Sequence, residues 1–125
     1  MALRTLDEQR AEAVEQLCDL IVPGSGRVGP TVYIDALISG MPPGVRAHAL
    51  ESIDALAPAA AAGAEALAEK ERTPEFAFVR ALAIEAFYSD FVAPGADGPG
   101  AWSEIDFNSP IALRINKDWS YLGVA

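Results

Sequence analysis

The side chains with which a small enzyme could do chemistry are few in this chain of 125 residues. It has one histidine, His48, one cysteine, Cys18, and 18 acidic residues. A nucleophile–histidine–acid triad would need His48 beside Cys18 or a serine, but these two residues belong to different predicted helices, and no pattern brings them together. Cys18 falls in an apolar helical stripe, which favours a small buried hydrophobic residue over a reactive thiol.

Metal and cofactor sites are not indicated by the residue spacing either. One histidine and one cysteine exclude a zinc site built from those ligands, and the acids near Asp97 lack the spacing of a calcium loop. The glycines of residues 24–29 suggest a phosphate loop, but no strand precedes them and no Gly-Lys-Ser/Thr follows, so a plain interhelix loop is favoured. We therefore expect no catalytic, metal or cofactor-binding residues in this chain.

The charge of the chain narrows the class of partner. A net charge of −9 and a pI near 4.4 argue against nucleic acid, whose affinity depends on Lys and Arg neutralising phosphates. They also argue against an anionic membrane surface. No stretch approaches the roughly 20 apolar residues that a membrane span needs, and charges throughout the first 22 residues leave no secretory signal. We expect no membrane insertion by this chain.

The elements that would position any functional side chain are helices, because the apolar residues recur at helical spacing and no segment alternates like a strand. Thr5 and Glu8 form a capping box that predicts a first helix over about residues 6–22. Pro30 predicts the start of a second helix, which would end near Gly40.

A third helix is expected from Pro43, with Pro58 interrupting or ending it. The Ala-rich stretch 59–71 then has strong helix propensity, although its only large apolar residue is Leu67. A helix with so little large apolar surface is expected to be exposed, or pressed close to a neighbour through its small residues.

The next predicted helix is the most apolar one. Thr73 caps it, Pro74 takes its first position, and residues 76–92 are apolar on nearly all sides, which is typical of a buried helix. Arg80 and Glu85 are its mid-helix charges, and each is expected to meet a partner elsewhere. The sequence thus predicts an all-α fold, with four or five helices around a central apolar helix in a domain of residues 1–93.

Residues 94–125 are expected to form a long, irregular C-terminal tail. This tail is rich in Pro and Gly at its start, yet it holds both tryptophans, Trp102 and Trp119. A disordered tail should be polar, because apolar groups are what offset the entropy lost on ordering. An irregular apolar segment needs a surface to lie on, and either the preceding helices or another protein supplies it.

Four short blocks, in this order and spacing, resemble a known family. Leu20-Ile21-Val22-Pro23 ends the first helix, Val32-Tyr33-Ile34-Asp35 opens the second, Ala86-Phe87-Tyr88-Ser89-Asp90 ends the central helix, and Gly100-Ala101-Trp102-Ser103-Glu104-Ile105 opens the tail. The set is similar to the small subunit of gluconate 2-dehydrogenase, the subunit 3 family, over about residues 6–107.

The resemblance implies an accessory subunit that carries no cofactor. Such subunits associate with a large FAD-dependent oxidoreductase of the glucose–methanol–choline type, which oxidises sugars or sugar acids. This chain departs from the family pattern in two ways. It shows no twin-arginine export signal, which favours the cytoplasm, or the periplasm if this is the mature form of an exported complex. It also continues beyond Phe107 to Ala125.

The first hypothesis is therefore a non-catalytic subunit that stabilises a flavin-dependent sugar or polyol oxidoreductase. The alternative is a self-contained helical domain that binds a small molecule, or a minor enzyme, whose tail closes its own pocket. A third reading has the tail help to close the partner's substrate site, with Asn116 or Trp119 touching substrate. The candidate partner-contact residues are Tyr33, Tyr88, Trp102, Phe107, Trp119 and Tyr121.

Overall fold

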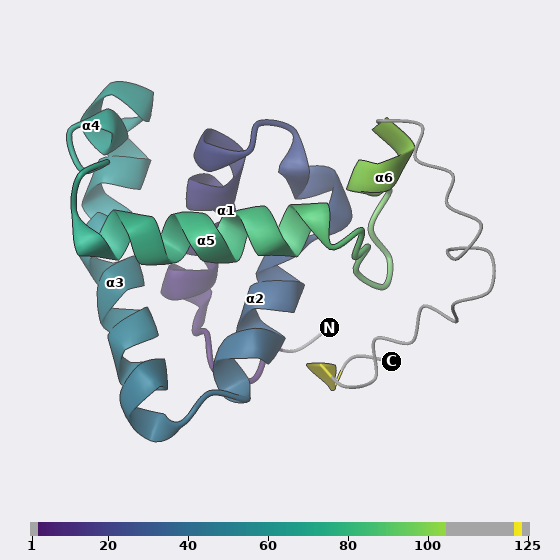
Figure 1. Cartoon of the computed structure of the whole chain (residues 1–125), viewed down its shortest axis with the longest axis horizontal. Helices are drawn as coiled ribbons and strands as arrows, with labels where there is room; N and C mark the ends of the chain where they lie inside the picture. Colours follow the sequence, from purple (N-terminus) through teal and green to yellow (C-terminus); the bar gives the residue numbers. More distant parts are fainter. Residues whose placement is uncertain (1–2, 105–121, 124–125) are drawn as a thin grey trace.

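The all-α prediction is confirmed. A computed structural model describes residues 3–104 and 122–123, and within these ranges the chain forms helices and no strand. Figure 1 shows α5 crossing the molecule from the side of α3 and α4 to α6. The elements are α1 (Glu8–Ile21), the 3-10 helix η1 (Ser25–Val28), α2 (Pro30–Ser39), α3 (Pro43–Ala62), α4 (Ala64–Ala68), α5 (Pro74–Tyr88) and α6 (Ala101–Glu104).

The start of α1 differs from the sequence prediction. Its N-cap is Asp7, whose carboxylate accepts the backbone N–H of Arg10 at 2.8 Å, so the capping box predicted at Thr5 is wrong. The backbone N–H of Thr5 donates instead to the carboxylate of Asp35 at 2.9 Å, and the Thr5 hydroxyl bonds the hydroxyl of Ser39. A distant acceptor on α2 therefore takes the donor that a local cap would have used.

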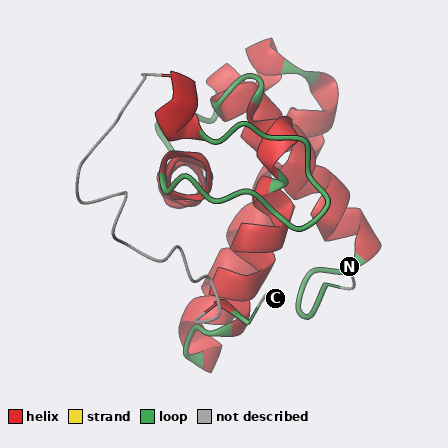
Figure 2. Cartoon of the chain, turned by 90° about the vertical axis from the view of Figure 1, so that its right-hand side faces the viewer, coloured by secondary structure: helices red, strands yellow, loops and turns green. Residues whose placement is uncertain are grey.

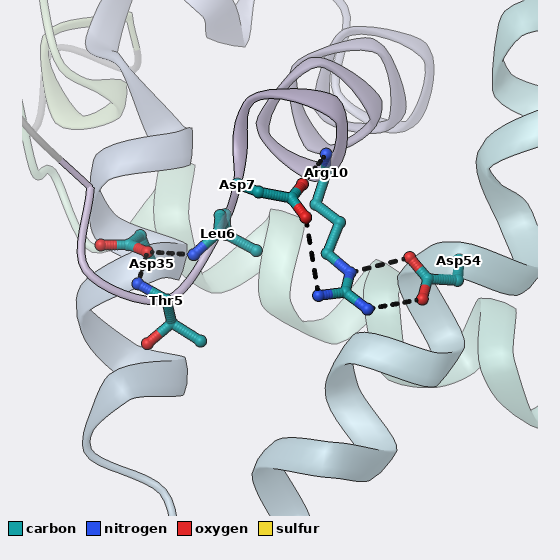
Figure 3. A network of polar contacts seen from close by, with 6 residues as sticks. All are labelled: Thr5, Leu6, Asp7, Arg10, Asp35 and Asp54. Carbon is teal, nitrogen blue, oxygen red and sulfur yellow. Dashed lines mark hydrogen bonds and ion pairs between the residues drawn. The ribbon is translucent and has the colours of Figure 1, made fainter.

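Asp35 fixes the segment before α1 on the side of α2. Its carboxylate is 3% exposed and accepts three backbone N–H groups, from Arg4 at 2.8 Å, Thr5 at 2.9 Å and Leu6 at 2.8 Å. Figure 3 shows the bonds from Thr5 and Leu6. A buried carboxylate is tolerated when donors replace the water it has lost. These three bonds bring Leu6 into the core, where it is buried.

Helix α2 has the bounds that the sequence predicts, from Pro30 to Ser39 with Gly40 as C-cap. Gly29 precedes it at φ 67°, and a Cβ there would lie 2.7 Å from the Cβ of Ala93. Glycine is needed at this position both for the left-handed backbone and for the close approach.

Helix α3 continues through Pro58 and ends at Ala62, so Pro58 does not end the helix. Proline costs the helix one hydrogen bond, but its position is exposed, and the alanines that follow keep a strong helix propensity. Of these alanines, Ala59 and Ala60 are buried, while Ala61 and Ala62 are exposed. The small residues on one side of this stretch thus pack against the core, as predicted.

Helix α5 occupies the predicted central position, because it packs against α1, α2, α3 and α6. Its N-terminus is also as predicted: the hydroxyl of Thr73 accepts the backbone N–H of Phe76 at 3.2 Å, and Pro74 follows. The helix ends at Tyr88 and not near Val92, and the chain then turns at Asp90, whose φ is 64°.

Burial of α5 on nearly all sides, by contrast, is not observed. One side of the helix is open to solvent, since exposed residues recur every three or four positions. Arg80 and Glu85 belong to this side and therefore need no buried partner. The exposed residues of α5 are Pro74, Ala77, Arg80, Ala81, Glu85 and Tyr88.

Two apolar clusters fill the interior. The larger joins side chains of α1, α2, α3 and α5, and it includes Leu122 from near the C-terminus, which is 5% exposed. The smaller cluster consists of Val22, Val28, Phe87 and Ala101. Where the tail is described, the chain's own helices thus supply the surface on which Ala101 and Leu122 lie.

The two ends of the described chain also meet. The Nη2 of Arg4 donates a hydrogen bond to the backbone carbonyl of Leu122. Because Arg4 is itself held by Asp35 through its backbone N–H, the residues before α1 link α2 to the turn at residues 122–123.

Replacing Asp35 by Asn should lower the free energy of unfolding by about 2–4 kcal/mol, because the amide removes the charge and turns an NH₂ group toward backbone donors. Urea unfolding followed by circular dichroism measures this loss. Asp97→Asn, at an exposed position, makes the same chemical change and should leave the midpoint unchanged. Equal midpoints for the two variants would contradict the anchoring role of Asp35.

Candidate functional site

The two residues with nucleophile or base chemistry do not form a site. Cys18 is 1% exposed on α1, and burial, with smaller contributions from the charges of Asp19 and Glu15, raises the pKa of its thiol to about 12. His48 is exposed on α3, where its ring packs edge-on against Phe78 with centroids 5.2 Å apart. The burial predicted for Cys18 is confirmed.

The described part of the chain contains neither a metal-binding cluster nor a membrane-spanning helix. No cluster of three or more His, Cys, Asp or Glu side chains is placed to hold a metal ion in residues 3–104 and 122–123. In the same ranges no helix has the length and apolar character needed to cross a bilayer.

A polar groove of about 560 Å³ runs between α1 and α3, and we call it the α1–α3 groove. Its most ordered feature is a two-pronged ion pair, in which Nε and Nη2 of Arg10 each donate to the carboxylate of Asp54 at 2.9 Å. Asp7 lies 3.8 Å from the same guanidinium, as Figure 3 shows. The groove is lined by Asp7, Gln9, Arg10, Glu12, Ala13, Gln16, Asp54, Ala57, Pro58 and Ala61.

The electrostatics of this groove are those of a structural ion pair. The hydrogen bond with Asp54 raises the pKa of Arg10, and the hydrogen bond with Arg10 lowers the pKa of Asp54. Both groups therefore stay charged and bound to each other over the physiological range. A half-exposed pair of this kind contributes at most about 1 kcal/mol to stability, and it occupies both the guanidinium of Arg10 and the carboxylate of Asp54.

A second groove of about 420 Å³ lies where the C-terminal ends of α1 and α5 meet, and we call it the α1–α5 groove. Six of its seven lining residues are apolar or aromatic, but Val22 and Phe87 are buried, and the surface that the groove presents is more polar than apolar. Tyr88 on its edge is 56% exposed, which is unusual for a large aromatic side chain. Arg80 is its one lining cation. The groove is lined by Ile21, Val22, Pro23, Arg80, Ile84, Phe87 and Tyr88.

The loop after α5 fixes the end of this helix beside the groove. The indole Nε1 of Trp102 donates to the backbone carbonyl of Tyr88 at 3.2 Å, and the backbone N–H of Trp102 donates to the Asp90 carboxylate at 3.2 Å. A Cβ on Gly100 would lie 2.2 Å from that carboxylate, so glycine is required there. Figure 2 views α5 end-on, with α6 and the loop on the near side.

The segment after α1 is bonded to the same loop. The guanidinium of Arg27 lies 5.1 Å from the ring centroid of Phe87, and its Nε donates to the carbonyl of Pro99 at 2.9 Å. The backbone N–H of Ala93 donates to the carbonyl of Val28 at 2.8 Å. The glycine-rich segment 24–29 thus forms a structural turn, η1, that supports the floor of the groove.

Three of the four sequence blocks meet at the α1–α5 groove. Residues 20–23 and 86–90 supply five of its seven lining residues, and Arg80 and Ile84 are the other two. Val22 and Phe87 form the floor together with Ala101 of the third block. The block 32–35 lies apart from the groove lining, on α2. There the ring of Tyr33 packs against Phe91 with centroids 5.3 Å apart, and Asp35 holds the N-terminal segment.

The candidate contact residues fall into three groups. Tyr88 is exposed and Trp102 is half-buried beside it. Tyr33 is 3% exposed, so its side chain belongs to the chain's own core and is not available to a partner in this structure. Phe107, Trp119 and Tyr121, like Asn116, lie outside the described residues.

Arg80 and Ile84 are groove residues that the sequence prediction did not select. Arg80, Ile84 and Tyr88 follow one another at intervals of four, which places them along one side of a helix. That spacing could have predicted that these three residues share one side of α5. It could not have predicted the residues of α1 that complete the groove, because they lie far from α5 in the sequence.

No protein-family model, curated protein or solved structure matches the chain. What the α1–α5 groove can do chemically follows from its lining: one exposed tyrosine and one cation can contact another molecule through an aromatic ring and a positive charge.

The burial of Cys18 predicts a thiol that does not react in the folded protein. With its pKa raised to about 12, the thiol should stay protonated at pH 8–9, where an ordinary cysteine is partly ionised. We expect Ellman's reagent to label the native chain orders of magnitude more slowly than the urea-unfolded chain. Rapid labelling of the native chain at pH 8 would contradict this environment.

Proposed function

We propose that the chain is a non-catalytic small subunit that stabilises and assembles with a large FAD-dependent oxidoreductase acting on sugars or polyols. The observation that carries the proposal is the exposed Tyr88 on the α1–α5 groove. Three of the blocks that resemble the gluconate 2-dehydrogenase small subunit meet around this groove, and tyrosine is among the residues enriched at protein–protein contacts.

The geometry of Tyr88 supports a contact role. A tyrosine offers a large apolar area with a polar end and loses few rotamers on binding, so it is favoured at the centre of interfaces. Its backbone is held by the end of α5 and by the Trp102 indole. A side chain presented from a fixed helix end loses less entropy on binding than one on a free loop.

In this proposal the chemistry belongs to the partner. FAD and the catalytic residues are in the large subunit, and this chain contributes contact surface through Tyr88 and Trp102. Tyr33 packs in the core and makes no contact with the partner, while Phe107, Trp119 and Tyr121 stay candidate contacts. The thiol of Cys18 is buried, and the guanidinium of Arg10 is hydrogen-bonded to Asp54. Both observations agree with a chain that does not catalyse.

A second candidate function is a self-contained domain that binds a small molecule. Two observations favour it: Leu122 returns to the chain's own core, and the α1–α3 groove, at about 560 Å³, has the volume of a ligand site. It is weaker because the one cation in that groove is already occupied by Asp54.

Co-expression with a large FAD-dependent dehydrogenase of the glucose–methanol–choline type from the same genome tests the proposal. We expect a yellow complex on size exclusion that reduces a dye when sugar or polyol is added. Tyr88→Ala should weaken assembly by at least about tenfold, because truncating a central aromatic contact costs at least 1.4 kcal/mol.

Val45→Ala is the matched control, since Val45 is the other large apolar residue that the described chain exposes, at 44%. It should leave assembly unchanged, and neither substitution should change the melting temperature of the lone chain. If the chain instead purifies alone, and a sugar or polyol shifts its own melting temperature, the second candidate is supported and the first is not.

A further inference from the structure

The turn at residues 122–123 is attached to the helices through one buried side chain. Leu122 is 5% exposed and belongs to the larger core cluster. The other members of this cluster all come from residues 3–96, on the helices α1 to α5 and the segments beside them. Because these helices also pack directly against one another, most of the core is held together without Leu122.

The guanidinium of Arg4 is the second attachment that the described residues give this turn. Its Nη2 donates a charge-assisted hydrogen bond to the carbonyl of Leu122. Gly123 lies against the same guanidinium: its φ is 77°, and a Cβ there would lie 2.6 Å from Nη2 and 2.7 Å from Nη1 of Arg4. A side chain at this position would displace the guanidinium, so glycine lets the turn approach it closely.

The backbone of Arg4 is fixed independently of its side chain. Its N–H donates to the buried carboxylate of Asp35 at 2.8 Å, so the guanidinium extends from a fixed point beside α2. Arg4 and Gly123 are exposed, and water can therefore replace the bond to Leu122 when the turn leaves. Opening then costs the burial of one leucine and one solvent-accessible hydrogen bond, which is less than the cost of unfolding the helices.

We infer that the turn at residues 122–123 is a strap, which opens and closes while α1, α2, α3 and α5 stay folded. Leu122 closes the strap by entering the core, and the Arg4 guanidinium fastens it from outside. The strap is a conformational device of this chain alone, and it does not depend on the flavoprotein partner of the proposed function.

Thiol labelling of the whole chain measures the opening directly, because the chain's own Cys18 is 1% exposed on α1 and reports unfolding of the helices. The thiol introduced by Leu122→Cys should react with Ellman's reagent faster than Cys18. It should react more slowly than the thiol introduced by Val45→Cys, at a position that is 44% exposed. Equal rates at positions 122 and 18 would overturn the inference, because the turn would then open only with the whole fold. Equal rates at positions 122 and 45 would also overturn it, because the turn would then not be docked.

The role of the guanidinium is tested by adding Arg4→Ala to Leu122→Cys. This substitution keeps the backbone N–H that Asp35 accepts, and it should speed labelling at position 122 by about three- to tenfold while the rate at Cys18 stays the same. Arg72→Ala is the matched control, since Arg72 is exposed and the loss of charge is the same; it should change neither rate. Equal effects of the two alanine substitutions would contradict fastening by Arg4.

A second pair of variants does not depend on an introduced thiol. Leu122→Asp should open the strap, because a buried carboxylate without donors is unfavourable, yet it should keep the helical circular dichroism signal and leave Cys18 unreactive. Leu82→Asp, at a position of α5 that is 6% exposed, makes the same change within the helical core and should unfold the chain. Unfolding by Leu122→Asp as well would show that Leu122 is an integral core residue and would overturn the inference. So would a labelling rate of Leu122→Cys that falls as protein concentration rises, because a second copy would then take part in the closure.

Discussion

The bonds from the carboxylate of Asp35 to the chain before α1 are the interaction on which the arrangement of the helices depends. Asp35 is the one buried acidic or basic residue of the described chain, and three backbone N–H groups bind it. They fix Leu6 in the core and bring Asp7 to the position where it caps α1. The direction of α1 follows, and with it the place where Ile21 meets α5.

Helix α5 combines two roles that its sequence does not separate. Its inner side, with Val79, Leu82 and Ala86, fills the core, whereas its outer side carries Arg80 and Tyr88. The outer side reads as apolar because alanine and tyrosine occupy it, which is why the helix was expected to be buried on nearly all sides. An apolar pattern around a helix thus has two causes, burial within the chain or burial against another molecule.

The sequence predicted correctly those helix ends that are set by residues close to them in the chain. Pro30 and Gly40 bounded α2, and Thr73 with Pro74 began α5, because caps and proline act within a few residues. The capping box at Thr5 failed because Asp35, on another helix, competes for the same donor.

The candidate site was predictable in the same limited sense. Tyr33 and Tyr88 each stand in a motif block, and both were selected as contacts. Tyr33 packs against Phe91 in the core, and Phe91 follows the end of α5, so spacing alone could not place it beside Tyr33. The groove itself is formed by α1 and α5 together, and such long-range pairing has no sequence period.

The hydrogen bond between Arg4 and Leu122 has a consequence for the order in which the protein is made. It joins residues 118 positions apart, whereas the bonds to Asp35 span only 29 to 31. On the ribosome, the Asp35 bonds can form while most of the chain is still unsynthesised. The carbonyl of Leu122 emerges 118 positions after Arg4, and closing so long a loop costs more entropy than closing a short one. A truncated translation product can therefore have its helices in place while the guanidinium of Arg4 is still open to water.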